Sequence, residues 1–155
     1  MTSATVDKAG VLAPPPIIYG VSLLVGLVAH WLQPQPVVSQ AVAHVIGPAF
    51  VLCGLVGLPA VRAFQRAGTS PLPWRPATAL VSTGPYRFTR NPMYVGFTLL
   101  YVGISLWLNT LWPLLLLPLV IVVMNWGVIA REERYLERRF GEEYLEYKRR
   151  VRRWI

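Results

Sequence analysis

Apolar and polar residues occur in this chain as long blocks, not as the short alternation of a half-buried strand. Four apolar stretches, approximately residues 14–32, 41–61, 92–108 and 111–130, contain no Lys, Arg, Asp or Glu. A helix that crosses a bilayer core needs about 20 apolar residues, and about 17 still suffice. The pattern predicts an all-α integral membrane protein with four transmembrane helices, of which the last two form a tight hairpin because only Asn109 and Thr110 separate them.

The charged residues predict how these helices are oriented. If all four stretches span a membrane, all 15 Lys and Arg residues and all 7 acidic residues lie on one side, and the loops 33–40 and 109–110 on the other side have no formal charge. Cytoplasmic loops of membrane proteins are enriched in Lys and Arg. We therefore expect a multi-pass protein of a plasma or inner membrane, with both termini and the 62–91 loop in the cytoplasm.

Composition supports this class. Hydrophobic residues make up 54% of the 155 residues and charged residues 14%, which is typical of membrane proteins. The net charge of +8 favours anionic lipid headgroups over nucleic acid as a partner, because the basic residues flank apolar stretches. An alternative makes the first stretch a signal peptide cleaved near residues 41–43. We predict no metal site: the single Cys53 is interpreted as a packed residue, and His30 and His44 as interfacial residues.

The last 25 residues carry a different pattern. Apolar side chains recur every three or four residues at Leu136, Phe140, Tyr144, Tyr147 and Val151, which predicts an amphipathic C-terminal helix, with a break near Gly141. Such a helix lies on anionic lipid or meets residues 75–94 to form part of a site, and the sequence leaves both interpretations open.

The segment TGPYRFTRNPMY, residues 83–94, precedes the third apolar stretch. Asn is favoured at a helix N-cap and Pro at the first helical position, so Asn91 and Pro92 are expected to begin the helix. The N–H groups of Met93 and Tyr94 would then be free to bind an anion. An alternative is a capped helix entrance whose arginines contact lipid phosphates.

In the predicted topology, two carboxylates lie on the same side of the membrane as this segment. Glu132 and Glu133 follow the fourth stretch directly, where desolvation of a charge is costly and a cationic ligand would justify them. Arginine binds carboxylates in a bidentate manner, and aromatic faces attract a sulfonium ion. Together these groups suit S-adenosylmethionine, which carries a carboxylate, an ammonium and a sulfonium.

Residues 78–151 resemble the isoprenylcysteine carboxyl methyltransferase and phospholipid methyltransferase family of integral membrane enzymes. The resemblance rests on LVSTGPYRFTRNPMYVG (80–96), the apolar hairpin, REE (131–133) and FGEEYLEYKRRV (140–151). It implies that S-adenosylmethionine contacts Thr78, Ala79, Leu80, Val81, Tyr86, Arg90, Asn91, Pro92, Met93, Tyr94 and Glu132. It also implies catalytic roles for Arg131 and Glu132, and support of the helix cap or of the cofactor carboxylate by Arg90.

Two positions depart from the family pattern. Asn91 stands where relatives often have His, and Val128 stands where the prenylcysteine enzymes carry an arginine associated with the substrate carboxylate. Arg131 is the nearest basic residue to that position. The methyl acceptor, whether carboxylate, thiol, amine or hydroxyl, therefore stays open, and with it the question whether Arg131 replaces the arginine.

The sequence as a whole is interpreted as one membrane methyltransferase domain, residues 1–155. Residues 1–13 are expected to be flexible, 14–77 to form an N-terminal helical pair and loop, and 78–155 to form the cofactor-binding half. The expected function is S-adenosylmethionine-dependent methyl transfer to a lipophilic or small acceptor. The alternatives are an NADPH-dependent membrane reductase and a non-catalytic scaffold or lipid-binding subunit. An oligomer is possible, but no residue pattern supports one.

Overall fold

The computed structural model describes residues 8–155, and over that range the chain forms helices and loops without strands. We expected residues 1–13 to be flexible. Of these, residues 1–7 lie outside the described residues. The helices are α1 (Pro15–Leu32), α2 (Gln40–Gly54), α3 (Gly57–Arg66), η1 (Gly84–Arg87), α4 (Pro92–Trp107), α5 (Leu111–Val123), the π-helical η2 (Met124–Ile129), α6 (Ala130–Phe140) and α7 (Glu142–Arg150). The predicted all-α class is confirmed.

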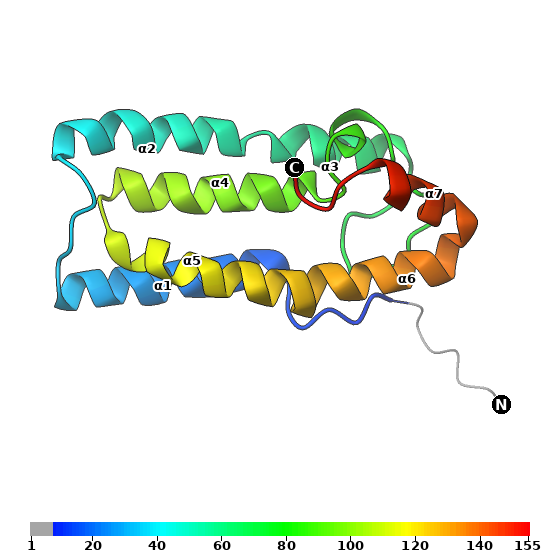
Figure 1. Ribbon diagram of the computed structural model, residues 1–155, viewed down its shortest axis with the longest axis horizontal. Helices are drawn as coiled ribbons and strands as arrows, with labels where there is room; N and C mark the ends of the chain where they lie inside the picture. The colour runs from blue at the N-terminus through cyan, green and yellow to red at the C-terminus, as the bar shows by residue number, and fades with distance from the viewer. Residues whose placement is uncertain (1–7) are drawn as a thin grey trace.

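Helices α1, α2, α4 and α5 lie side by side and run along the long axis of the molecule (Figure 1). The connections from α1 to α2 and from α4 to α5 lie at one end, and α3, α6 and α7 lie toward the other. Although α4 and α5 are joined by a tight turn, α4 packs mainly against α2, and α5 packs mainly against α1. The two helices of the hairpin are thus neighbours in the chain, but each packs mainly against a helix outside the hairpin.

Three helical runs are long and apolar enough to cross a membrane: Pro15–Leu32, Gln40–Arg66 and Leu111–Phe140. The fourth predicted span, Pro92–Trp107, is apolar but has only 16 residues. A prediction of four spans with cytoplasmic termini therefore stays a prediction. Two runs extend well past the apolar stretches, to 66 and to 140, because a helical backbone satisfies its own hydrogen bonds whether its side chains are apolar or charged.

Glycines allow α2 and α4 to approach closely. A Cβ atom added to Gly47 would lie 2.5 Å from the backbone of Trp107, and one added to Gly103 would lie 2.6 Å from the backbone nitrogen of Val51. Small residues permit such contact between membrane helices. Gly96 of α4 packs in the same way against the backbone of Gly54, the last residue of α2, and of Gly57, the first residue of α3.

The turn between α4 and α5 is held by Asn109, whose φ is 51°. Asn tolerates this left-handed conformation better than most residues. Its Oδ1 accepts hydrogen bonds from the N–H groups of Val37 and Val38, at 2.9 and 3.1 Å, and its Nδ2 donates to the carbonyl of Val38 at 2.8 Å. One side chain therefore ties together the two loops at this end of the bundle.

The predicted break in the C-terminal helix occurs at Gly141, where φ is 53° and α6 gives way to α7. Tyr144 and Tyr147 are buried against Ala60 and Ala63 of α3 and against the segment 81–86. Leu136, Phe140 and Val151 pack around this cluster. The amphipathic stripe therefore faces the protein, and of the two interpretations the structure supports the contact with residues 75–94.

Candidate functional site

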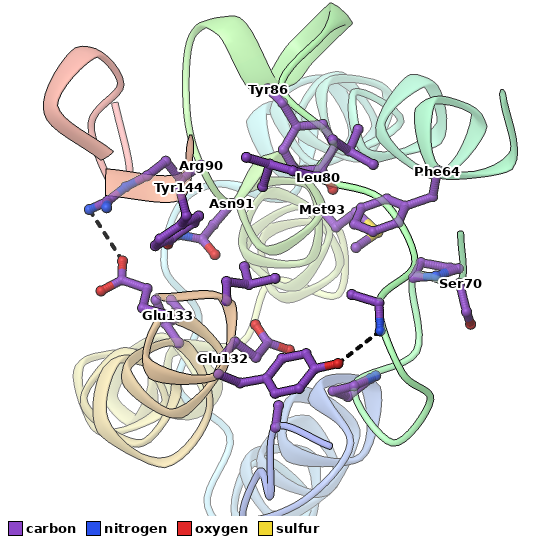
Figure 2. A pocket seen from close by; sticks show the side chains of 18 of the residues that line it. Phe64, Ser70, Leu80, Tyr86, Arg90, Asn91, Met93, Glu132, Glu133 and Tyr144 are labelled. Atoms are coloured by element: carbon purple, nitrogen blue, oxygen red, sulfur yellow. Dashed lines mark hydrogen bonds and ion pairs between the residues drawn. The ribbon is translucent and has the colours of Figure 1, made fainter. Parts of the chain in front are cut away.

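A cavity lies at the end of the bundle where α3, α4, α6 and α7 meet (Figure 2). The cavity itself has a volume of about 110 Å³, and the space grows to about 860 Å³ when the solvent at its open mouth is included. The loop 70–81 covers one side, and Tyr135 of α6 pins this loop because its hydroxyl accepts the N–H of Ala77 at 2.9 Å. Figure 2 shows Arg90 and Glu133 across the cavity from Phe64 and Met93.

Glu132 presents a carboxylate to this cavity. The buried hydroxyl of Tyr94 donates to its Oε1 at 2.7 Å and lies 2.9 Å from its Oε2. Tyr94 belongs to the first turn of α4 and Glu132 to the first turn of α6, so this contact joins the two helices. No Lys or Arg within residues 8–155 forms an ion pair with Glu132, and burial raises the pKa of its carboxyl to about 7. A cation bound beside it would favour the ionised form.

Arg90 presents positive charge to the same cavity. Its Nη2 lies 3.2 Å from Oε1 of Glu133, and the two side chains are only 10% and 8% exposed. Its Nε and Nη1 are buried and have no hydrogen-bond partner in the described part of the chain. Buried donors are normally paired, so these two N–H groups indicate a site for an acceptor that the chain itself does not provide.

Asn91 occupies the N-cap position of α4, as predicted, but its side chain does not cap the helix. Its Nδ2 donates instead to the carbonyl of Arg153 at 2.8 Å. The expectation of a free N–H at Tyr94 is also wrong, because this group donates to the carbonyl of Asn91 at 3.0 Å. The N–H of Tyr94 is thus satisfied within the first turn of α4, whereas Nε and Nη1 of Arg90 have no partner in the described region.

Three tyrosines form a neutral wall. Burial raises the pKa of Tyr86, Tyr144 and Tyr147 above the ordinary value of a phenol, so they stay protonated and act as hydrogen-bond donors at neutral pH. The hydroxyl of Tyr147 donates to the carbonyl of Tyr86 at 2.8 Å. Phe64 meets Tyr86 edge to face, with ring centroids 5.5 Å apart.

The segment before α1 passes beside the cavity. Ala9 lines it, and the N–H of Leu12 donates to the carbonyl of Gly127 at 2.9 Å. Arg131 donates from Nη1 to the carbonyl of Gly10 at 2.9 Å and is exposed. The π-helical turn of η2 thus offers a carbonyl to this segment, and Arg131 holds it in place.

The cavity brings together most of the residues predicted for the cofactor. Those that line it are Ala79, Leu80, Val81, Tyr86, Arg90, Asn91, Met93, Tyr94 and Glu132. Thr78, Pro92 and Arg131 do not line it. Thr78 uses its polar groups within the loop, where its N–H donates to Oγ1 of Thr69 at 3.0 Å and its hydroxyl donates to the carbonyl of Gly68 at 3.2 Å.

Sequence reasoning missed several parts of the wall. Phe64, Leu72 and Leu136 supply apolar surface to the cavity, and Tyr135 supplies the loop contact. Phe64 and Leu72 belong to the half of the chain in which no motif was found. Glu133 was noticed beside Glu132, but nothing in the sequence indicated that it would bind Arg90.

The structure has a mostly apolar cavity, with Glu132 and Arg90 in its wall, at one end of a bundle of apolar helices. Comparison with known proteins places the chain in a family. Residues 42–143 match the family model described as phospholipid methyltransferase. This stretch is more than half of the chain, runs from α2 into α7, and contains both Arg90 and Glu132. The chain belongs to the phospholipid methyltransferase family, and the resemblance predicted from its motifs is confirmed.

Curated relatives agree with this assignment. Over 72 residues the chain is 36% identical to a protein-S-isoprenylcysteine O-methyltransferase of Schizosaccharomyces pombe, and over 74 residues it is 40% identical to that of Saccharomyces cerevisiae. Each match covers 46% of this chain and 30% of the relative. An uncharacterized protein of Haemophilus influenzae is 44% identical over 63 residues, which are 41% of this chain and all of that protein. No solved structure gives a significant match.

Proposed function

We propose that this protein is an integral membrane methyltransferase that binds S-adenosylmethionine in the cavity between α4 and α6 and methylates a lipophilic or small acceptor. The observation that carries the proposal is the presence, in one cavity of the described chain, of a carboxylate without an ion pair and of an arginine with unpaired nitrogens. Glu132 has no cationic side chain in an ion pair, and Arg90 has two buried N–H groups without partners, both within residues 8–155. A ligand with an ammonium and a carboxylate neutralises both.

The groups present fit the amino-acid end of this cofactor. A carboxylate of the ligand accepts hydrogen bonds from Nε and Nη1 of Arg90, a bidentate arrangement that suits a guanidinium. The carboxylate of Glu132 binds the ammonium, and Tyr94 holds it in place through the hydroxyl contacts of 2.7 and 2.9 Å. The rings of Tyr86 and Phe64 provide apolar and aromatic surface beside them.

When bound, the cofactor supplies a methyl group already activated by a positively charged sulfur. The acceptor atom attacks the methyl carbon with a lone pair, the carbon–sulfur bond breaks, and its electron pair stays on sulfur as a neutral thioether. The protein aligns acceptor and methyl group and keeps water away. Loop 70–81 and the aromatic wall perform this second task.

An amine acceptor would also have to lose a proton. Tyr86, Tyr144 and Tyr147 are poor bases because burial raises the pKa of each hydroxyl. Glu133 is occupied by two arginines. Of the groups in the wall, Glu132 would suit proton removal from an amine acceptor best because burial raises its pKa to about 7, but this role competes with its contact to the cofactor ammonium. A thiolate or carboxylate acceptor needs no such base.

The proposed topology places the cavity in the cytoplasm. Four spans, with α4 as the shortest, put the uncharged loops 33–40 and 109–110 on one side and the Arg-rich ends of the other segments on the opposite side. The cavity lies at the charged end, near α6 and α7. We propose a plasma or inner membrane location, in which the soluble cofactor enters from the cytoplasm and an apolar acceptor enters between helices. In this proposal residues 1–155 act as one domain. The cofactor is bound by residues 78–155 and also by the part of the loop 70–81 that precedes them.

Calorimetry on detergent-purified protein tests this proposal with S-adenosylhomocysteine, which has the same amino-acid end. Glu132→Gln removes the charge that faces the ammonium and is expected to weaken binding by about 1.5–3 kcal/mol, the usual value for a hydrogen bond to a charged group. That loss is about 10–150-fold in Kd. Glu143→Gln removes the same charge from an exposed position of α7 and is expected to leave Kd unchanged.

Equal affinity of the wild type and Glu132→Gln would contradict the site assignment. Binding of NADPH, with no binding of S-adenosylhomocysteine, would contradict the methyltransferase proposal itself. The acceptor is identified by transfer of a radiolabelled methyl group in a screen of small thiols, prenylcysteine analogues, fatty acids and phospholipids. Absence of transfer to every acceptor, together with absence of cofactor binding, would favour a non-catalytic scaffold.

A further inference from the structure

The residues that follow α7 contact the cavity wall from outside. The guanidinium of Arg153 binds Glu133 through two bonds, from Nε to Oε1 at 3.0 Å and from Nη2 to Oε2 at 2.6 Å. This contact raises the pKa of Arg153 above its ordinary value. A bidentate pair of this kind fixes the orientation of a carboxylate as well as its position.

Glu133 transmits this orientation to the cavity. Its Oε1 also contacts Nη2 of Arg90 at 3.2 Å, so one buried carboxylate lies between two guanidinium groups. The cluster has one negative and two positive charges, and Nε and Nη1 of Arg90 have no partner in the described region. An uncompensated buried charge is costly, and an anion that binds to Arg90 removes this cost.

The same segment binds the backbone around Arg90. The carbonyl of Arg153 accepts hydrogen bonds from Oγ1 of Thr89 at 3.0 Å and from Nδ2 of Asn91 at 2.8 Å. The carbonyl of Arg152 accepts the N–H of Arg90 at 2.9 Å. Residues 89–91 are thus each hydrogen-bonded to the carbonyl of Arg152 or of Arg153.

The segment is itself anchored. The indole of Trp154 donates to Oδ1 of Asn125 in η2 at 3.0 Å, and its ring packs against the core that contains Tyr94 and Val128. Residues 152–154, which we term the C-terminal clamp, therefore connect the bundle core to the anion-binding arginine. None of the three lines the cavity.

We propose that Arg153 is a positioning residue for the cofactor carboxylate. It holds Glu133 so that Glu133 engages only Nη2 of Arg90, and the other two nitrogens, Nε and Nη1, stay free for the ligand. This inference rests on the proposed function, because it takes the carboxylate to be that of S-adenosylmethionine. A purely structural role for the clamp would affect every ligand of the cavity alike, whereas a positioning role affects only ligands that carry the carboxylate.

The test uses S-adenosylmethionine and its decarboxylated form, which differ only in that carboxylate. Kd values are measured by calorimetry on the full chain in detergent, for the wild type and for Arg153→Gln, Arg153→Lys and Arg152→Gln. Arg152 is the matched control because it is adjacent, exposed and equally charged, and it takes part in the clamp through its backbone carbonyl, which the substitution keeps.

We expect Arg153→Gln to weaken S-adenosylmethionine binding about tenfold, the effect of one charge-assisted hydrogen bond, and to leave the decarboxylated ligand unchanged. Arg153→Lys keeps the charge but loses the bidentate geometry, so it is expected to restore part of the affinity. It also replaces the Gln variant as the test if the latter does not fold. Arg152→Gln is expected to bind both ligands as the wild type does.

Two results would overturn the inference: equal weakening of both ligands by Arg153→Gln, or unchanged binding of both in a folded variant. If the wild type binds neither ligand, the proposed function fails, and the inference fails with it. If the wild type discriminates between the ligands but Arg153→Gln discriminates equally well, only the role of Arg153 is lost.

Discussion

A methyl group added at Gly96 would test whether backbone contact between helices fixes the wall of the cavity. The Cβ atom of Gly96→Ala would lie 2.9 Å from the carbonyl oxygen of Gly54 and 3.0 Å from the Cα and N atoms of Gly57. All three atoms belong to the backbone and cannot rotate away. Since an ordinary contact begins at 3.4 Å, α4 must move by 3.4 − 2.9, or about 0.5 Å.

Overpacking of this kind costs about 1–3 kcal/mol. For a domain of this size, each kcal/mol lowers Tm by about 2–4 °C, so a decrease of roughly 2–12 °C is expected. Met93 and Tyr94 line the cavity from the same helix, one turn before Gly96. We therefore expect cofactor affinity to fall together with stability.

The neighbouring glycine provides the control. A Cβ atom at Gly57 has no neighbour closer than 3.8 Å, which is ordinary van der Waals contact. Gly57→Ala is therefore expected to keep the Tm of the wild type, although it faces the same interface. Thermal unfolding in detergent, followed by tryptophan fluorescence, gives both values. An unchanged Tm for Gly96→Ala, or equal decreases for the two variants, would refute the argument that backbone contact sets the helix separation.

Two further predictions concern other parts of the molecule. Asn109→Ala removes the acceptor of two backbone N–H groups and places Ala at a positive φ. The free energy of unfolding should therefore fall by about 2–3 kcal/mol. The Kd for S-adenosylhomocysteine should not change, because the cavity lies at the opposite end of the bundle. Stability should also fall above pH 10, because the pKa of Tyr86, Tyr144 and Tyr147 is raised in the folded state. The unfolded chain then loses protons that the folded chain keeps, at a cost of up to about 1.4 kcal/mol per pH unit for each tyrosine. Absorbance of tyrosinate near neutral pH, or a Tm that rises above pH 10, would contradict this assignment.

The apolar blocks of the sequence were sufficient to predict the helices but not their ends. The predicted fourth stretch ends at residue 130, where charge begins, yet the helical run continues to Phe140. Charge indicates where a chain leaves an apolar environment, whereas a helix ends where its backbone bonds find other partners. Here that point is Gly141, whose positive φ no apolar pattern marks.

Most residues of the site were predictable from the sequence, but the ion pairs between them were not. Arg90 and Glu132 were both expected at the cofactor, and both line the cavity. The ion pair of Arg90, however, is with Glu133, and the orientation of Glu133 depends on Arg153. A run of arginines near the C-terminus gives no indication of which one turns inward. The contact of its side chain with Glu133 distinguishes Arg153 from Arg152, because both residues bind the segment 89–91 through their carbonyls.

The case of Asn91 shows how a correct local rule yields a wrong contact. Asn is a favoured N-cap residue because its side chain accepts a backbone N–H of the first turn, and Asn91 does occupy that position. In the structure its amide donates to the carbonyl of Arg153, while the N–H of Tyr94 finds the carbonyl of Asn91. The tertiary bond takes the place of the side-chain cap. It also ties the beginning of α4 to the C-terminal clamp, which lies beyond the motif FGEEYLEYKRRV (140–151) on which the resemblance rests.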